Sequence, residues 1–177
     1  MVDPHEVIAA LDLRPLPREG GYYRESYRSE LRLPSGLSAL ASEKSLTTAI
    51  YYLLTPDSFS ALHRLPADEL FHFYLGDPVL MLQLEPEGDG KVVTLGTDLA
   101  SGQAPQVLVR RGVWQGSCLA GGGKFALLGT TMSPGFDFAD YEPGERASLK
   151  SRYPAFAHWI DCLTRAGESV TASSDTR

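Results

Sequence analysis

A run of titratable side chains interrupts the apolar pattern of the chain between residues 63 and 76. Its sequence, HRLPADELFHFYLG, places His63 and His72 on either side of Glu69. A carboxylate beside an imidazole favours the protonated ring and fixes its orientation. Such a pair suits a general base, a metal site or a hydrogen-bonding clamp for a ligand, and equally a buried pair that satisfies only itself.

The strand expected over ELFHFYLG decides which of these side chains share a surface. Successive side chains of a strand point to opposite faces, so two sets are predicted. One set contains Glu69, Phe71 and Phe73, and the other contains Leu70, His72 and Tyr74. The short turn at 66–68 follows the strand of His63 and is expected to bring it across to Glu69 inside the barrel. His72 should then point away from Glu69.

The elements that position these residues are short strands. After a β-branched and aromatic run at LTTAIYYLL, six apolar runs follow, divided by Gly, Pro and Asp: SFSALHRL, ELFHFYLG, VLMLQLEP, KVVTLG, QVLVRRGVWQG and KFALLGTTM. This pattern is typical of an antiparallel sandwich or barrel and not of alternating βα units. Before these runs, after Gly20 and Gly21, a strand with one solvent-exposed face is expected at YYRESYRSEL. The stretch 33–45 is expected to be a loop.

Helices are predicted at both ends. At the N-terminus, Asp3 is the expected cap, Pro4 the first helical residue and Glu6 the third, which is a capping box. Near the C-terminus, helical turns are expected at 145–152, and a second helix, which packs outside the β core, is expected from Pro154. These elements form one domain, 1–165, with a barrel core at about 20–140, followed by a flexible tail at 166–177.

Composition limits the partners. The 177 residues carry a formal charge of -6, which disfavours nucleic acid and anionic membrane surfaces. The sequence has no stretch of roughly 20 apolar residues and no signal-like N-terminus, so a cytoplasmic location is expected. Cys118 and Cys162 are interpreted as reduced packing residues, because their spacing fits neither a metal site nor a disulfide framework.

Four segments together resemble the Cupin_5 group of small cupins: EGGYYRESYRS, SALHRLPADELFHFYLGDPV, RGVWQG and PGFDFADYEPGERASLKSRYP. The resemblance implies a mainly β fold, the cupin double-stranded β-helix (a jelly-roll barrel), and a homodimer. It also implies a shape similar to that of sugar-nucleotide 3,5-epimerases, which use a histidine base held by an acid, and a tyrosine acid.

The cupin motifs are altered here. The first motif runs His, any residue, His, three or four residues, Glu, six residues, Gly, and Leu65 stands at the second histidine. The second motif ends in Pro, any residue, Gly, two residues, His, and Gln115 stands at that histidine. Only His63 and Glu69 of the four usual ligands remain, and an amide is a poor ligand for a transition metal. No tightly held metal is therefore expected, and a weak divalent metal at His63, Glu69 and Gln115 is the alternative.

Carried onto this chain, the resemblance makes His63 the base and Glu69 the residue that orients it. The acid is left open among Tyr23, Tyr74 and Tyr141. Arginines that could meet a phosphate or carboxylate are Arg24, Arg64 and Arg110. The aromatic residues Phe71, Phe73, Trp114, Phe136 and Phe138 suit a core or an apolar pocket wall equally. The predicted ligand-binding set is Gln115, His72, Tyr74, Arg24, Tyr23, Phe71, Phe73 and Phe136.

Three functions fit these residues. The first is a metal-independent isomerase or epimerase acting on a small polar, carbohydrate-like molecule, since proton abstraction beside a carbonyl needs one imidazole and an oxygen stabiliser. The second is a metabolite-binding or sensor protein without turnover. The third is a metal-dependent enzyme in which His72 replaces a missing ligand.

Overall fold

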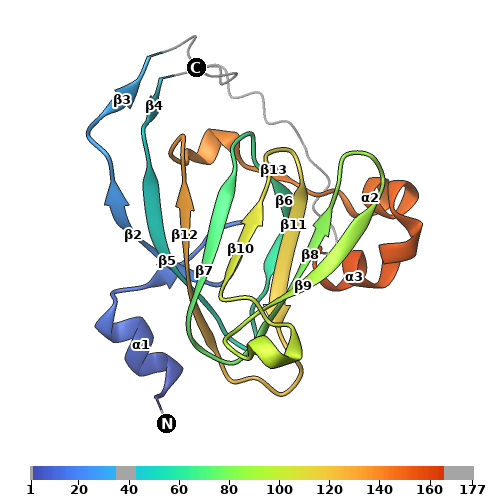
Figure 1. The fold of residues 1–177 in the computed structure, drawn as a ribbon, viewed down its shortest axis with the longest axis horizontal. Helices are drawn as coiled ribbons and strands as arrows, with labels where there is room; N and C mark the ends of the chain where they lie inside the picture. Colours follow the sequence, from blue (N-terminus) through green and yellow to red (C-terminus); the bar gives the residue numbers. More distant parts are fainter. Residues whose placement is uncertain (1, 35–42, 166–177) are drawn as a thin grey trace.

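Two antiparallel sheets face each other in the computed structural model, which describes residues 2–34 and 43–165 (Figure 1). The six-stranded sheet has the order β1 (Arg14–Pro15), β2 (Tyr22–Arg28), β5 (Thr48–Leu54), β12 (Ala126–Met132), β7 (Glu69–Gly76) and β10 (Gln106–Val109). The five-stranded sheet has the order β13 (Glu142–Pro143), β6 (Ser60–Arg64), β11 (Trp114–Leu119), β8 (Val79–Leu84) and β9 (Gly90–Leu95). This mainly β architecture confirms the predicted fold class.

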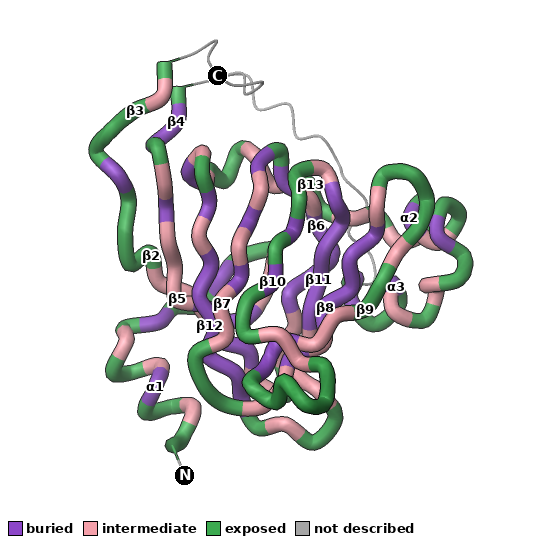
Figure 2. The backbone as a smooth tube through the Cα atoms, in the orientation of Figure 1, coloured by how far each residue is buried: buried purple, intermediate pink, exposed green. Residues whose placement is uncertain are grey.

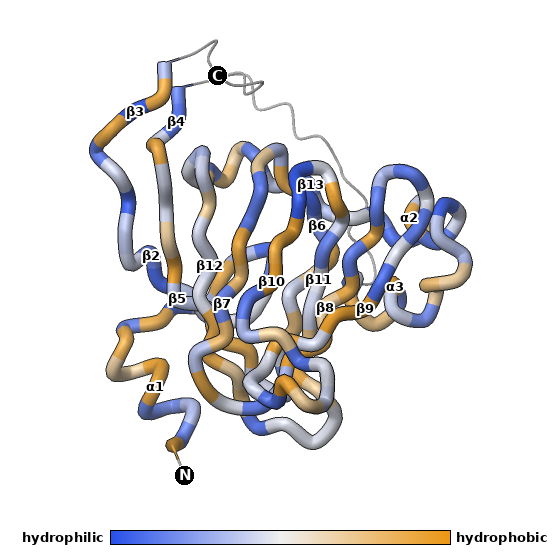
Figure 3. The backbone as a smooth tube through the Cα atoms, viewed as in Figure 1, coloured by the Kyte–Doolittle hydropathy of each residue, from blue (hydrophilic) through white to orange (hydrophobic). Residues whose placement is uncertain are grey.

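The core lies between the two sheets. Phe71 and Leu128 from the six-stranded sheet meet Met81 from the five-stranded sheet, and all three are almost fully buried. Strand β8 is buried on both faces, because Leu82 and Leu84 point the other way into a second cluster. The buried segments accordingly concentrate on the central strands, and apolar residues lie along the same stretches (Figures 2 and 3).

The helices cover the outside of the sheets. Helix α1 (Pro4–Ala10) begins with the predicted capping box between Asp3 and Glu6, and its Val7 packs with the outer-face residue Leu53. Helices α2 (Arg146–Arg152) and α3 (Ala157–Cys162), joined by η3 (Pro154–Phe156), pack on the five-stranded sheet. Two further 3-10 turns are η1 (Leu99–Ser101) and η2 (Phe138–Asp140). None of the helices in the described ranges is long and apolar enough to cross a membrane.

One predicted run divides between the sheets. QVLVRRGVWQG contains both β10 and β11, which lie in different sheets. The chain turns at Gly112, whose φ of 79° is easy for glycine and whose N–H donates to the Leu65 carbonyl at 2.8 Å. Glycine at this position therefore permits the turn that carries the chain from one sheet to the other.

The expected loop at 33–45 is bounded by a short pair of strands. β3 (Arg32–Leu33) and β4 (Lys44–Ser45) pair with each other and project beyond the six-stranded sheet as an arm (Figure 1). Residues 35–42 of that loop and the tail at 166–177 lie outside the described residues.

Strand β7 has the two faces that its alternation predicts. Phe71 lies in the core, whereas His72 and Tyr74 are on the opposite, outer face, where their rings lie nearly parallel. His63 and Glu69 line the same pocket, as predicted, but not as a pair across neighbouring strands, because β6 and β7 belong to different sheets. The two residues approach the barrel interior from opposite walls.

Candidate functional site

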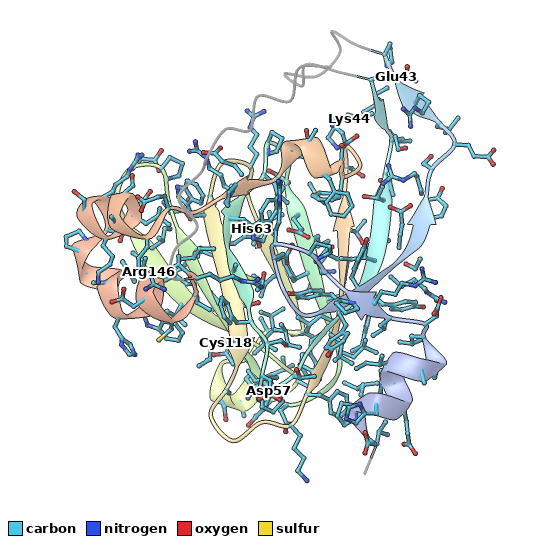
Figure 4. All side chains as sticks on the ribbon, turned by 180° about the vertical axis from the view of Figure 1, so that it is seen from behind. Glu43, Lys44, Asp57, His63, Cys118 and Arg146 are labelled. Atoms are coloured by element: carbon cyan, nitrogen blue, oxygen red, sulfur yellow. The ribbon has the colours of Figure 1, made fainter. Side chains whose placement is uncertain are left out.

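A cavity of about 420 Å³ lies between the sheets, a volume within the range of small-molecule sites. Its titratable and aromatic lining includes His63, Glu69, Glu19, Tyr23, Tyr52, Tyr141, Phe136 and Phe138. His63 is 2% exposed and Glu69 is 7% exposed, so these two mark the inner end. In Figure 4, His63 lies between the strands near the middle of the molecule.

The orientation of the His63 ring is set by the backbone of its own strand. The Nδ1 atom lies 2.8 Å from the Ala61 carbonyl oxygen. A carbonyl oxygen can only accept, so Nδ1 carries the hydrogen and, in the neutral ring, Nε2 keeps its lone pair. The structure thus provides a buried imidazole whose basic nitrogen does not face its own backbone.

The acid closest to that nitrogen is Glu19, which the sequence analysis did not select. Its Oε2 lies 4.0 Å from His63 Nε2, while its Oε1 accepts a 2.8 Å hydrogen bond from Ser60 Oγ. Its carbonyl also accepts from the Ala61 N–H at 2.8 Å. The available signal was its position directly before Gly20 and Gly21, within a segment that carries the family resemblance.

Glu69 is held by the amide that replaces a cupin histidine. Gln115 Nε2 donates to Glu69 Oε2 at 2.6 Å, and both side chains are buried. Burial raises the pKa of Glu69, and the negative charge of Glu19 raises it further, although His63 and the hydrogen bond from Gln115 act in the opposite direction. Glu69 therefore keeps its proton to higher pH than an exposed glutamate does.

Two tyrosines complete the inner pocket. The ring of Tyr141 stacks on His63, with centroids 4.9 Å apart and planes inclined by 24°. Tyr52 donates its hydroxyl hydrogen to the Gly20 carbonyl at 3.0 Å. Burial, aided by the charge of Glu19, raises the pKa of Tyr52 well above its ordinary value, so its phenol stays protonated. Tyr52 can therefore accept a hydrogen bond from a ligand but does not supply a phenolate.

Four residues of the predicted catalytic and ligand-binding sets line the pocket and the others do not. The pocket contains His63, Glu69, Tyr23 and Phe136. The predicted residues outside its lining are Gln115, His72, Tyr74, Arg24, Phe71 and Phe73. Gln115 is the cross-strand partner of His63 and donates to Glu69, and the two phenylalanines belong to or pack against the hydrophobic core.

The alternation of side chains along a strand explains why some of the predicted residues lie on the outer face of the sheet. His72 lies 3.2 Å from Thr131 Oγ1 and 3.2 Å from Gln106 Nε2, and Arg24 lies over the ring of Tyr51. Of the other arginines considered, Arg64 forms two 2.7 Å hydrogen bonds to Glu142. Arg18 and Arg28 line the pocket instead.

The donor set does not fit a tightly bound metal ion. Leu65, at the place of the second motif histidine, packs with Ala67 and Met132, and Gln115 turns its NH2 group toward Glu69. Within the described ranges, no three His, Cys, Asp or Glu side chains are grouped closely enough to hold a metal ion. One imidazole with carboxylates and an amide is a weak set for a transition metal.

Comparison with known proteins places these features in a group. A family model described as Cupin_5, cupin superfamily (DUF985), matches residues 5–143. An uncharacterised protein of Saccharomyces cerevisiae is 32% identical over 135 residues, which cover 70% of this chain and 67% of the yeast protein.

Solved structures give the same result. A Shewanella oneidensis protein is 36% identical with a TM-score of 0.82, covering 93% of this chain and 99% of its own. A hypothetical protein from Leishmania major is 30% identical with a TM-score of 0.84, covering 92% and 99%. An oxalate decarboxylase of Bacillus subtilis is only 12% identical, with a TM-score of 0.51 over 86% of this chain and 37% of the enzyme. That last likeness shows the fold alone.

Proposed function

The chain belongs to the Cupin_5 family of the cupin superfamily, and on that premise we propose that its pocket binds a small, polar, carbohydrate-like molecule and isomerises it. The observation that carries the proposal is the Nδ1 contact of His63 with the Ala61 carbonyl, because it leaves Nε2 as the basic nitrogen. The carboxylates of the pocket accept hydrogen bonds from hydroxyl groups, and its aromatic rings suit the apolar face of a sugar.

The reaction that this set supports is proton transfer beside a carbonyl group. Nε2 of His63 takes the proton from the hydroxyl-bearing carbon next to the carbonyl, and the carbonyl oxygen is protonated by Glu69, which gives an enediol. The adjacent hydroxyl then returns its proton to Glu69 as the new carbonyl forms, and His63 delivers its proton to the former carbonyl carbon. Atoms balance, and both groups return to their starting states.

The positions of the two rings disfavour an epimerisation in which Tyr141 is the acid. Inversion at a carbon requires removal of a proton from one face and delivery to the other, so base and acid must flank the substrate. His63 and Tyr141 are stacked and share one wall of the pocket. A single base that works on one face is sufficient for isomerisation, and Glu19, 4.0 Å from Nε2, stabilises the imidazolium that forms.

Solvent exchange tests the proposal across a panel of candidate substrates. Aldoses and ketoses of three to six carbons, with their phosphate esters and sugar acids, are incubated with the protein in D2O and followed by NMR. Deuterium should appear at the carbon beside the carbonyl, and His63→Gln should slow this by about a hundredfold or more. His5→Gln, in α1 and outside the pocket, is the matched control. Equal exchange in the wild type and His63→Gln would reject the base assignment.

The second candidate is binding without turnover. The same stacked pair of His63 and Tyr141 forms a flat aromatic wall, which supports a sugar ring whether or not chemistry follows. Binding of a sugar from this panel, detected by NMR line broadening, with no deuterium incorporation would favour this candidate over the isomerase.

We also propose that the protein is a homodimer built through the projecting arm. Leu31 is 67% exposed and Leu46 is 40% exposed, and the Leu46 N–H donates to the Leu31 carbonyl, so both side chains lie at one place on the arm. Beside them, among the residues that the structure describes, β2 is paired on its outer side by β1 only at Tyr22 and Tyr23. An exposed apolar arm next to an open strand edge supports pairing with a second copy.

A further inference from the structure

The loop from Leu16 to Gly21 separates two charges at the pocket. Glu19 turns inward to Ser60 and His63, whereas its neighbour Arg18 is exposed and also lines the pocket. The loop therefore presents the Glu19 carboxylate to the inner end, while the exposed residue Arg18 belongs to the outer part of the lining.

The backbone of this loop is tied at several points. The Leu16 N–H donates to the Gly21 carbonyl and the Gly20 N–H donates to the Leu16 carbonyl, both at 3.0 Å. Tyr52 Oη and the Ala61 N–H bind the Gly20 and Glu19 carbonyls. These bonds close the loop on itself and fix it to β5 and β6, so the base of Arg18 is held in place.

Arg18 itself has a strained backbone and an uncommitted side chain. Its φ is 66°, in the left-handed region that a long side chain adopts only at a cost. Of the two arginines that line the pocket, Arg28 makes 2.9 and 2.7 Å bonds to Glu25. The described residues give Arg18 neither a hydrogen bond nor an ion pair.

The other cations near the rim are already committed to carboxylates. Arg28 is paired with Glu25, and Lys44 Nζ, which lies 4.0 Å from Asp137, is hydrogen-bonded to Asp140 at 2.8 and 2.9 Å. Arg18 is thus the rim group with unused donors, five N–H groups arranged in a plane that matches a carboxylate or a phosphate. Planar N–H donors at the mouth suit an anionic group, and the acceptors deeper in the pocket suit hydroxyl groups. The pocket therefore fits a molecule with an anionic end and a hydroxylated end.

We propose that the pocket takes an anionic ligand, whose phosphate or carboxylate group binds Arg18 at the rim while its hydroxylated end reaches His63, Glu19 and Glu69. This deepens the proposed function and rests on it, because the anion belongs to the same molecule that the inner residues hold. The substrate class becomes a sugar phosphate or a sugar acid, and neutral sugars bind more weakly.

Simple anions test the rim separately from the inner pocket. Inorganic phosphate, acetate and tetramethylammonium are titrated into the full 15N-labelled chain, and NMR follows the Arg18 Nε resonance and the backbone amides of the loop. A saturable shift with phosphate or acetate is expected, and the affinity measured on the loop amides should be about tenfold weaker in Arg18→Gln. The tighter of the two anions identifies the source of the charge.

Two variants control the measurement. Arg14→Gln removes an exposed arginine outside the pocket lining, whose partner Asp12 is 3.4 Å away, and should leave anion affinity unchanged. Arg18→Gly should lose anion binding yet melt at a higher temperature, since glycine adopts the positive φ without strain, so unfolding could not explain the loss.

No saturation at Arg18, equal anion affinity in Arg18→Gln, or saturation by tetramethylammonium alone would overturn the proposal. Because the titration needs no turnover, anion binding without deuterium exchange would reject the isomerase and leave the rim site standing. Exchange with no anion binding would reject only the rim site.

Discussion

Glu19 Oε2 lies 4.0 Å from His63 Nε2. In the neutral ring this nitrogen carries no hydrogen, because Nδ1 donates its hydrogen to the Ala61 carbonyl oxygen. A second carboxyl group, that of Glu69, lines the same pocket from the opposite sheet. The pocket of this imidazole therefore contains two acids with different surroundings. Glu19 accepts a hydrogen bond from Ser60, and the buried Glu69 accepts one from Gln115.

The raised pKa of Glu69 should appear in the pH dependence of stability. The folded state binds this proton more tightly than the unfolded chain, so stability falls as pH rises from the unfolded pKa of about 4.3 through the folded pKa. Glu69→Gln mimics the protonated carboxyl group. It should change the melting temperature little at acidic pH and raise it relative to wild type at pH well above the folded pKa. Calorimetry across that range would contradict the assignment if the difference did not depend on pH.

The amide of Gln115 should matter through Glu69. In Gln115→Ala, the buried Glu69 carboxyl group loses its 2.6 Å donor, which should cost about 1–3 kcal/mol of unfolding free energy. Since that hydrogen bond lowers the pKa of Glu69, its removal should raise the pKa further. Urea unfolding and carboxyl NMR titration measure the two effects.

Gln83→Ala is the matched control, because Gln83 is equally buried but its bond to the Leu108 carbonyl is longer, at 3.3 Å. A similar loss of stability in both variants, with the pKa of Glu69 unchanged in Gln115→Ala, would show that the hydrogen bond from Gln115 neither lowers the pKa of Glu69 nor stabilises the fold more than that of Gln83 does.

Tyr141 distinguishes a stacking ring from a catalytic acid. Tyr141→Phe keeps the ring that stacks on His63 at 4.9 Å and removes only the hydroxyl. The isomerase proposed above should then exchange deuterium at a rate less than about tenfold below wild type, and Tyr141→Leu should be slower because the wall is lost. A loss of a hundredfold or more in Tyr141→Phe would instead make the phenol a proton donor, as in the epimerase-like cupins.

The arm should control assembly. Size-exclusion chromatography with light scattering is expected to give the mass of two chains, and Leu31→Lys with Leu46→Lys should give a monomer, since charged residues at an apolar contact disfavour burial. Leu99→Lys, at a leucine that is 68% exposed on η1, should leave the dimer intact. A monomeric wild-type protein would contradict the proposal.

Local sequence determined the elements and their faces. The capping box at Asp3, the alternation along β7 and the glycine turn at Gly112 are each set by residues within a few positions of one another. Such short-range rules hold because side-chain direction and backbone freedom depend on the local chain. The quoted motifs also placed the chain in its family, which the family match over 5–143 confirms.

Only the tertiary structure decided which side chains contact one another inside the barrel. Short spacing suggested His63 with Glu69, yet these residues lie on opposite sheets, and Glu19, 44 positions earlier than His63, supplies the nearer carboxylate. Tyr141, 78 positions later than His63, stacks on its ring. Contacts of this kind depend on how strands are assigned to sheets and on where loops close over the barrel. Those are properties of the whole packed chain, which no local spacing encodes.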